Sequence, residues 1–171
     1  MTAPSTYTDT NETGCCAVPN LADWDRVVVE FDDQPFIRLH TRSVMHVPVD
    51  MSRVMAALDA SAREAGVAMP PERAMVLSRE LSAWKAEQLY AVTAPAAGAD
   101  NVRLDGRFAC VAFEGPYRRV STWMSEAREY ARSQGEPGDE TYVFYTTCPR
   151  CAKHYGSNNV IVLVPLSPSS W

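Results

Sequence analysis

The chain has 171 residues, of which 46% are hydrophobic and 22% are charged, and its net charge is −5. These proportions are typical of one globular domain with its own core. The negative charge argues against a broad basic face for nucleic acid, and no apolar run approaches the roughly 20 residues that span a bilayer. We therefore expect neither a nucleic-acid partner nor a membrane partner.

Residues 1–19 are predicted to form a flexible N-terminal arm that carries two adjacent cysteines, Cys15 and Cys16. The first 14 residues are polar and show no basic segment followed by an apolar one, as a secretion signal would. This pattern favours a cytoplasmic protein, in which the five cysteines stay reduced. Metal ligands or free thiols are then more natural roles for them than a disulfide framework.

Residues 20–171 are expected to form a single domain, whose first half spans about 36–94. A lead-in segment or first strand at 20–33 is followed by a β-rich run at 36–49. Asp50 is placed to cap a helix with its carboxylate. The apolar face of this helix follows helical spacing and consists of Val54, Met55, Leu58 and Ala62. Gly66 ends the helix, and two strands are predicted at 73–81 and 85–93.

The second half, about 101–166, repeats this order. Strands at 102–104 and 107–113 lead into a helix that Gly115 and Pro116 open and Gly135 ends. The buried stripe of the helix recurs every three or four residues; it comprises Val120, Trp123, Met124, Ala127, Tyr130 and Ala131. Strands at 141–147 and 159–164 then pair, with a tight cysteine-containing turn at their tip.

The repetition predicts an α+β fold. Two βαββ halves would form an antiparallel sheet, with two helices on one side and a groove between the halves. Such a groove is a common place for a small-molecule pocket. The pattern leaves the oligomeric state open, including a homodimer that pairs through exposed strand edges.

The pair Cys148-x-x-Cys151 places two thiolates within reach of one metal ion. A structural zinc site needs four ligands, and Cys15 and Cys16 complete it if the arm packs against the hairpin tip. Because adjacent side chains diverge, His154 or a water can replace one of them. Two alternatives stay open. One is a redox thiol pair, which the absence of a helical pattern after Cys148 disfavours; the other is a tight hairpin with free thiols.

Glu114 and Tyr117 are the best candidates for acid–base catalysis. A carboxylate at the end of a strand can activate a water, while the phenol of Tyr117 or Tyr145 donates a proton to the leaving atom. The simpler alternative is that Glu114 complements the dipole of the helix that follows it.

Four further side chains are candidates for ligand contact: Trp84, His46, Tyr90 and Trp123. Trp84 lies in a connection between strands, where binding residues are often found. Trp123 falls in the helical stripe and fits core packing equally well, and His46 fits an ordinary strand residue. We expect no nucleotide cofactor, because no glycine-rich phosphate loop or dinucleotide motif is visible.

The strand that runs into Gly115-Pro116-Tyr117, and the last strand ending in Val164-Pro165-Leu166, resemble those of the GyrI-like domains. The chain resembles more specifically a group of small bacterial proteins labelled "hydrolase". The segments that carry this second resemblance are Cys15-Cys16, His46-Val47-Pro48, Ser82-Ala83-Trp84-Lys85, 113–117 and 146–156.

The GyrI-like resemblance implies two βαββ halves and a cleft for flat aromatic or cationic molecules. Some relatives sequester or sense drugs, and some hydrolyse strained toxins with a glutamate and a tyrosine. The chain departs from the drug-binding pattern, since its last strand, 160–166, carries no carboxylate. Glu114 also stands where a histidine usually precedes Gly-Pro-Tyr, and the resemblance makes it a candidate replacement for the missing acid.

We therefore expect the protein to bind a small aromatic or electrophilic molecule between its halves and to hydrolyse it, as in detoxification, self-resistance or drug resistance. One alternative is a module that binds and sequesters such a molecule without turnover. Another is a zinc-stabilised interaction domain.

Overall fold

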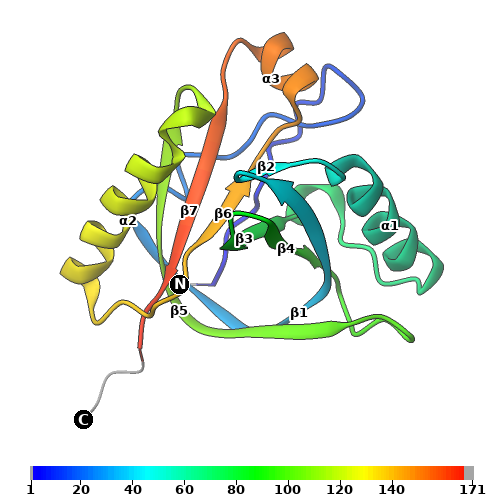
Figure 1. Ribbon diagram of the computed structural model, residues 1–171, viewed down its shortest axis with the longest axis horizontal. Helices are drawn as coiled ribbons and strands as arrows, with labels where there is room; N and C mark the ends of the chain where they lie inside the picture. Colours follow the sequence, from blue (N-terminus) through cyan, green and yellow to red (C-terminus); the bar gives the residue numbers. More distant parts are fainter. Residues whose placement is uncertain (1, 168–171) are drawn as a thin grey trace.

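The structure is a computed structural model that describes residues 2–167; residues 168–171 of the expected domain lie outside the described residues. Figure 1 shows its strands and helices. The strands are β1 (Val27–Val44), β2 (Val47–Pro48), β3 (Val76–Ser82), β4 (Lys85–Ala91), β5 (Asn101–Glu114), β6 (Tyr142–Tyr145) and β7 (Asn159–Pro165). The α-helices are α1 (Met51–Glu64), α2 (Val120–Gln134) and α3 (Pro149–Tyr155), with single 3₁₀ turns at Pro71–Arg73 and Tyr117–Arg119.

All strand pairs of the sheet are antiparallel, in the order β2-β1-β4-β3-β6-β7-β5. β1 also pairs with β5, so the sheet curves round on itself and is barrel-like. The prediction of an α+β fold with antiparallel strands is confirmed. Among residues 2–167, no helix is long and apolar enough to cross a membrane.

Two long strands replace predicted pairs of shorter elements. β1 joins the expected lead-in at 20–33 to the β-rich run at 36–49, because a bulge between Phe31 and Gln34 bends the strand without ending it. Its first part pairs with β5 and its last part with β4. β5 likewise joins 102–104 to 107–113, and Gly106 takes up the bend with a φ of 94°.

Asp50 precedes α1 as predicted, but its side chain does not cap the helix. The carboxylate instead accepts a hydrogen bond from the backbone N–H of Arg42 at 2.8 Å and pairs with Arg53 at 2.9 Å. It is therefore used to fix the turn between β1 and α1.

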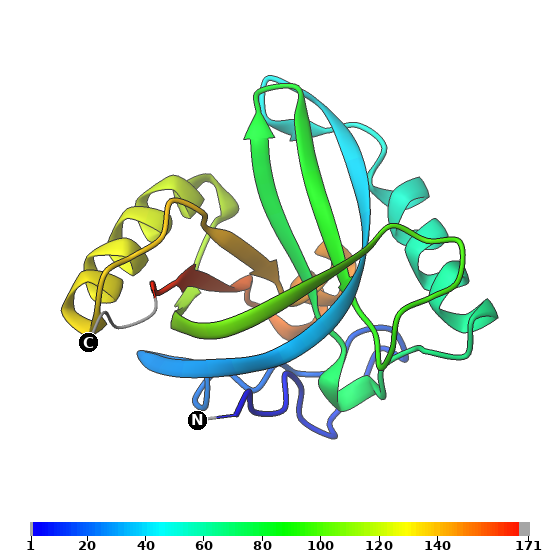
Figure 2. The ribbon, with the colours of Figure 1, turned by 90° about the horizontal axis from the view of Figure 1, so that it is seen from below.

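The core has three clusters on the two faces of the curved sheet. The inner cluster, which includes Phe36, Leu77, Leu89, Phe108 and Leu163, fills the concave side. On the strands, alternate residues point the other way. There α1 covers Ile37 and Val92, and α2 covers a set that includes Val111 and Val162. Both long helices thus pack on the face opposite the inner cluster, as Figure 2 lets the reader follow.

The order strand, helix, strand, strand occurs twice, as β1, α1, β3, β4 and as β5, α2, β6, β7. Two elements interrupt it: the short strand β2 follows β1, and α3 separates β6 from β7. The connection between β3 and β4 is a tight turn at 83–84, whereas the connection between β6 and β7 holds a helix.

The described part of the N-terminal arm, residues 2–19, lies against the domain. Thr6 donates its hydroxyl to the carbonyl of Ala74 at 2.7 Å, and Tyr7 donates to the carbonyl of Thr146 at 2.6 Å. The ring of Tyr7 packs against the inner cluster. This course brings the arm to the beginning of α3, where the two cysteine pairs meet.

Candidate metal centre and the adjoining surface pocket

The segment after Cys148 is a helix, so the prediction that no helix follows this residue is wrong. Cys148 is extended, with φ −67° and ψ 160°, and Pro149 opens α3 at its first position. Gly156 ends the helix in the left-handed region, with a φ of 77°. Seven residues give too little periodicity for the pattern to be recognised in the sequence.

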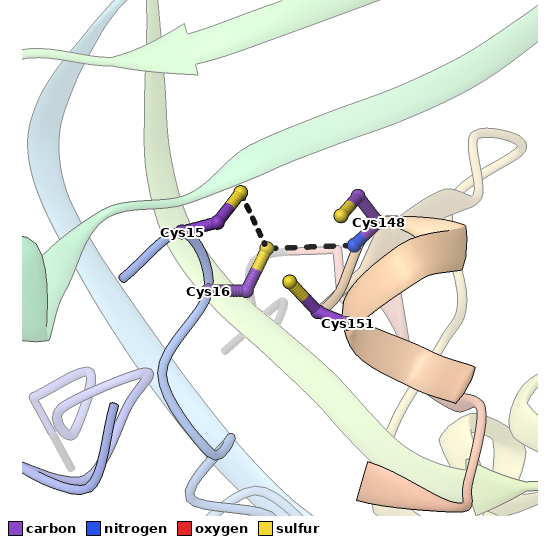
Figure 3. Close-up of side chains that lie close together, drawn as sticks. All are labelled: Cys15, Cys16, Cys148 and Cys151. Carbon is purple, nitrogen blue, oxygen red and sulfur yellow. Dashed lines mark hydrogen bonds between the residues drawn. The ribbon is translucent and has the colours of Figure 1, made fainter. Parts of the chain in front are cut away.

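The structure brings the four cysteines Cys15, Cys16, Cys148 and Cys151 together, which we call the cysteine cluster (Figure 3). Their four sulfur atoms all lie within 4.8 Å of one another, and the sulfurs of Cys15 and Cys16 are 3.8 Å apart. A tetrahedral ion with metal–sulfur bonds of about 2.3 Å sets its sulfurs about 3.8 Å apart. The cluster can therefore hold a metal ion such as zinc.

Thr13 is the residue that turns the arm so that both adjacent cysteines converge. Its hydroxyl oxygen accepts hydrogen bonds from the backbone N–H groups of Cys15 at 3.2 Å and Cys16 at 3.3 Å. The same oxygen lies 3.2 Å from the sulfur of Cys151, on the other chain segment of the cluster. Our expectation that neighbouring cysteines diverge took no account of this turn.

The cysteines differ in acidity. The hydrogen bond from Thr13, assisted by those from Cys148 and Cys16, lowers the pKa of Cys151 to about 6. Burial raises the pKa of Cys16 and of Cys15. A bound cation would favour the thiolate form at all four positions, and Cys151 provides the first such thiolate.

His154 is not among the grouped ligands, although we considered it as a substitute for a cysteine. Its Nε2 lies 3.0 Å from the carboxylate of Glu12, on the arm. The neighbouring Tyr155 donates its hydroxyl to the carbonyl of Cys16 at 2.8 Å and accepts from the N–H of Glu12 at 3.2 Å. Both side chains thus join α3 to the arm beside the cluster.

A surface pocket of about 600 Å³ lies on another side of α3. It is lined by Glu114, Gly115, Tyr117, Pro149, Ala152, Lys153, Gly156, Ser157 and Asn158. The end of β5, the turn before α2, and α3 with the residues that follow it provide these side chains. The pocket thus contains two of the predicted catalytic residues.

Gly115 shapes the floor of this pocket. Its φ of 143° is unfavourable for a side chain, and a Cβ there would lie 3.2 Å from Cζ2 of Trp123. Trp123 itself is 2% exposed and stacks on Phe113, with 5.5 Å between the ring centroids. A glycine is therefore required where the strand passes over the ring and delivers Glu114 to the pocket.

The two tyrosines that we considered as acids lie side by side. The rings of Tyr117 and Tyr145 meet edge to face, with centroids 5.4 Å apart. Tyr117 donates to the carbonyl of Thr147 at 3.3 Å, and burial raises the pKa of both phenols. Both therefore stay protonated near neutral pH, as an acid must. Tyr145 does not belong to the lining of the pocket.

Two buried side-chain oxygens next to this region lack a hydrogen-bond partner among the described residues: Oγ1 of Thr147 and Oδ1 of Asn159. Asn159 follows Asn158 of the pocket lining and pairs with Glu114 across β5 and β7. Thr147 provides the carbonyl to which Tyr117 donates. Buried polar atoms are rarely left unpaired; these two are closed off from the pocket, since neither residue belongs to its lining.

None of the four candidates for ligand contact belongs to the lining of this pocket. Trp84 is 59% exposed in the turn between β3 and β4. His46 lies nearby, with Nδ1 2.5 Å from the carboxylate of Glu80. Tyr90 packs beneath α1 and donates to Asp59 at 3.0 Å, and Trp123 belongs to the cluster beneath α2.

Sequence reasoning missed several residues of the site. These are Thr13 of the cysteine cluster and Lys153, Ser157 and Asn158 of the pocket. The signal that was available is their position: Thr13 lies two residues before Cys15, and the other three lie within the seven residues after the Cys148-x-x-Cys151 motif.

A family model described as "Bacterial hydrolase" matches residues 6–166 of the chain. No protein of curated function matches it significantly.

Among solved structures, the chain is similar to an uncharacterised conserved protein from Listeria innocua. The identity is 12%, the match covers 84% of this chain and 93% of that one, and the TM-score is 0.57, which indicates a shared fold. A second match is SAV2435 bound to tetraphenylphosphonium, with 11% identity, coverage of 82% of this chain and 93% of that one, and a TM-score of 0.46.

Proposed function

Because the chain belongs to the bacterial hydrolase family, we propose that it binds a small electrophilic or aromatic molecule in the surface pocket and hydrolyses it. The observation that supports this most is that Glu114 and Tyr117 line the same pocket. A carboxylate and a phenol that face one space are the two groups required for acid–base hydrolysis. The pocket lies within residues 114–158, so the proposed site is not the groove between halves that the sequence suggested.

In this mechanism Glu114 accepts a proton from a water as the water oxygen attacks the electrophilic carbon. The bond from that carbon to the leaving atom breaks, and Tyr117 donates its proton to the leaving atom. Glu114 then returns a proton to Tyr117 through solvent. Lys153, from the α3 wall, adds a positive charge that can stabilise negative charge on the substrate. Tyr145 supports the ring of Tyr117.

The experiment compares turnover of small esters, lactones and epoxides by the wild type and by Glu114→Gln. The amide keeps the shape of the carboxylate but cannot take the proton, so we expect a loss of about 10²–10⁴-fold. Glu126→Gln, an exposed glutamate of α2, is the matched control and should keep wild-type turnover. Equal turnover by Glu114→Gln would remove Glu114 from the mechanism.

A sequestering module is the second candidate for the same pocket, and the polar lining residues Ser157 and Asn158 favour it because they can hydrogen-bond a ligand without chemistry. It predicts that a compound binds with equal affinity to the wild type and to Glu114→Gln and is recovered unchanged from both. Any product formed by the wild type alone would exclude it for that compound.

We also propose that the ion of the cysteine cluster is zinc, with a structural role. Soft thiolates select zinc over magnesium or calcium, and four cysteine ligands leave no open position for a reacting water. Reduced cysteines of this kind fit the cytoplasmic location that we propose for the protein. Metal analysis of purified protein should give about one zinc per chain, and Cys148→Ser together with Cys151→Ser should remove it.

The repeated order of elements supports a further proposal, that the chain is a GyrI-like domain of two βαββ units. The strands of the two parts also pair in the same order. In the first part β1 pairs with β4 and β4 with β3, and in the second part β5 pairs with β7 and β7 with β6. An experimental structure in which the two units superpose strand for strand would bear this out, and units that do not superpose would refute it.

A further inference from the structure

We propose that the metal ion of the cysteine cluster assembles the surface pocket. By joining α3 to the N-terminal arm, the ion fixes the wall that faces Glu114, so that the pocket has its shape only in the metal-loaded protein. This inference rests on the proposed function only where it concerns turnover; the ordering of α3 is independent of it.

The first observation is that α3 serves the cluster and the pocket with different residues. Cys151 is fully buried and its sulfur meets those of the arm. Pro149, Ala152 and Lys153 of the same helix line the pocket. In a helix of two turns, the position of one side determines the position of the other.

The second observation is that the arm provides most of what holds α3 to the rest of the protein. No residue of α3 belongs to any of the three hydrophobic clusters within the described residues. Its side chains reach Glu12 through His154, Glu12 and Cys16 through Tyr155, and Thr13 through Cys151. A seven-residue helix is not stable alone, so this docking is needed to keep it folded.

The third observation is that the docking surface is weak without an ion. The arm around the cluster is largely exposed, and Cys15 in particular is exposed. Thiols are poor hydrogen-bond donors, and the contact between His154 and Glu12 is half exposed on both sides, where even a charged pair contributes little. Four metal–sulfur bonds replace this weak contact with a strong one, as in small domains that fold only with zinc.

The class of ligand is therefore a thiolate-binding divalent ion, and zinc chloride is the probe. The experiment measures amide hydrogen exchange of wild-type protein after removal of metal with a chelator, and again after one equivalent of zinc is added. We expect exchange in residues 149–157 and 11–16 to slow at least tenfold on zinc addition. Exchange in α2 and in the central part of β5 should stay the same. Equal protection of α3 with and without zinc would overturn the inference.

Three variants test whether the ordering of α3 depends on the four cysteines. Cys148→Ser should behave like the metal-free wild type at any zinc concentration, whereas Cys110→Ala, which changes a buried cysteine outside the cluster, should still respond to zinc. Tyr155→Phe keeps all four thiols but removes the hydroxyl that joins the arm to α3, so exchange of α3 should become faster only in the metal-free state. Should Cys148→Ser fail to fold, the comparison of metal-free and zinc-loaded wild type decides alone.

Glu114→Gln separates this inference from the proposed function. It should bind zinc and order α3 as the wild type does. If zinc orders α3 but Glu114→Gln retains turnover, the hydrolytic mechanism fails and the metal-dependent pocket stands. If metal-free wild type keeps full turnover with a mobile α3 while Glu114→Gln is inactive, the inference fails and the mechanism stands.

Discussion

The two passages from a long strand into a helix differ sharply in what they present to solvent. The first passage, residues 44–51, and the neighbouring turn between β3 and β4 expose apolar side chains. Among residues 2–167, six of the seven exposed large hydrophobic side chains lie in or beside these two segments: Val44, Met45, Val47, Val49, Leu81 and Trp84. Figure 2 shows this region, in cyan and green, as an extension that projects from the body of the molecule.

The second passage, residues 114–120, forms a wall of the surface pocket instead. The difference follows from the connections that stand next to them. The turn at Ala83 and Trp84 is too short to cover the first passage, whereas the segment between β6 and β7 contains α3 and reaches over the second. The surface pocket beside the second passage is thus built with α3, an element that the connection between β3 and β4 lacks.

The two tryptophans of these regions offer the largest contrast in stability. Trp123 is 2% exposed beneath the second passage, and Trp84 is 59% exposed beside the first. We expect Trp123→Ala to lower the free energy of unfolding by about 3–5 kcal/mol, because it leaves a cavity. Trp84→Ala should change it by less than about 0.5 kcal/mol. Urea denaturation measures both free energies, and similar losses for the two variants would contradict the difference in burial between the two tryptophans.

Two glycines, one within the second passage and one after α1, differ in the same way. Gly115 has a φ of 143° and a Cβ position 3.2 Å from Trp123, whereas Gly66, after α1, has a φ of 68° and faces open space. Gly66→Ala should cost about 1 kcal/mol for the left-handed backbone alone. Gly115→Ala should cost about 2–3 kcal/mol, since crowding is added to the strain. The same denaturation experiment measures the difference, and equal costs would mean that the strand can move off the ring.

Substitutions of Thr13 test whether its hydrogen bonds position the cysteines of the arm for metal binding. Thr13→Val keeps the shape of the side chain but removes the oxygen that bonds the amides of Cys15 and Cys16 and the sulfur of Cys151. Loss of such supporting contacts should weaken zinc binding about tenfold, measured by competition with a coloured chelator. Thr13→Ser retains the oxygen and should bind zinc as the wild type does. Unchanged affinity in Thr13→Val would show that the cluster forms without this turn.

The contrast also explains which features were predictable from the sequence. Hydrophobic periodicity gave the positions of α1 and α2, because Leu58 and Trp123 sit on faces that one sheet buries. Hydrophobic periodicity did not predict α3, since a helix of seven residues is too short for its apolar positions to repeat. The bulge could not be predicted either, because no residue pattern around Phe31 indicates that β1 continues through the bend.

For the candidate site, the type and spacing of residues predicted some of the residues involved but not how they come together. Cysteines and the Glu-Gly-Pro-Tyr passage could be singled out because their chemistry is unusual at those positions. The convergence of residues 13–16 with 148–151 is a tertiary contact between distant segments, so only a structure brings it into view. Trp84 and His46 carried equally suggestive chemistry, yet they lie in the other region, where no helix covers them.

X-ray absorption at the zinc edge of the purified, zinc-loaded protein is the sharpest test of a zinc ion held by the cysteine cluster, because it reports the atoms that surround the metal. We expect four sulfur neighbours at about 2.3 Å and no nitrogen or oxygen neighbour. A first shell that contains nitrogen would place His154 at the ion and break its link to Glu12. A protein that takes up no zinc would contradict the metal centre and the pocket that depends on it.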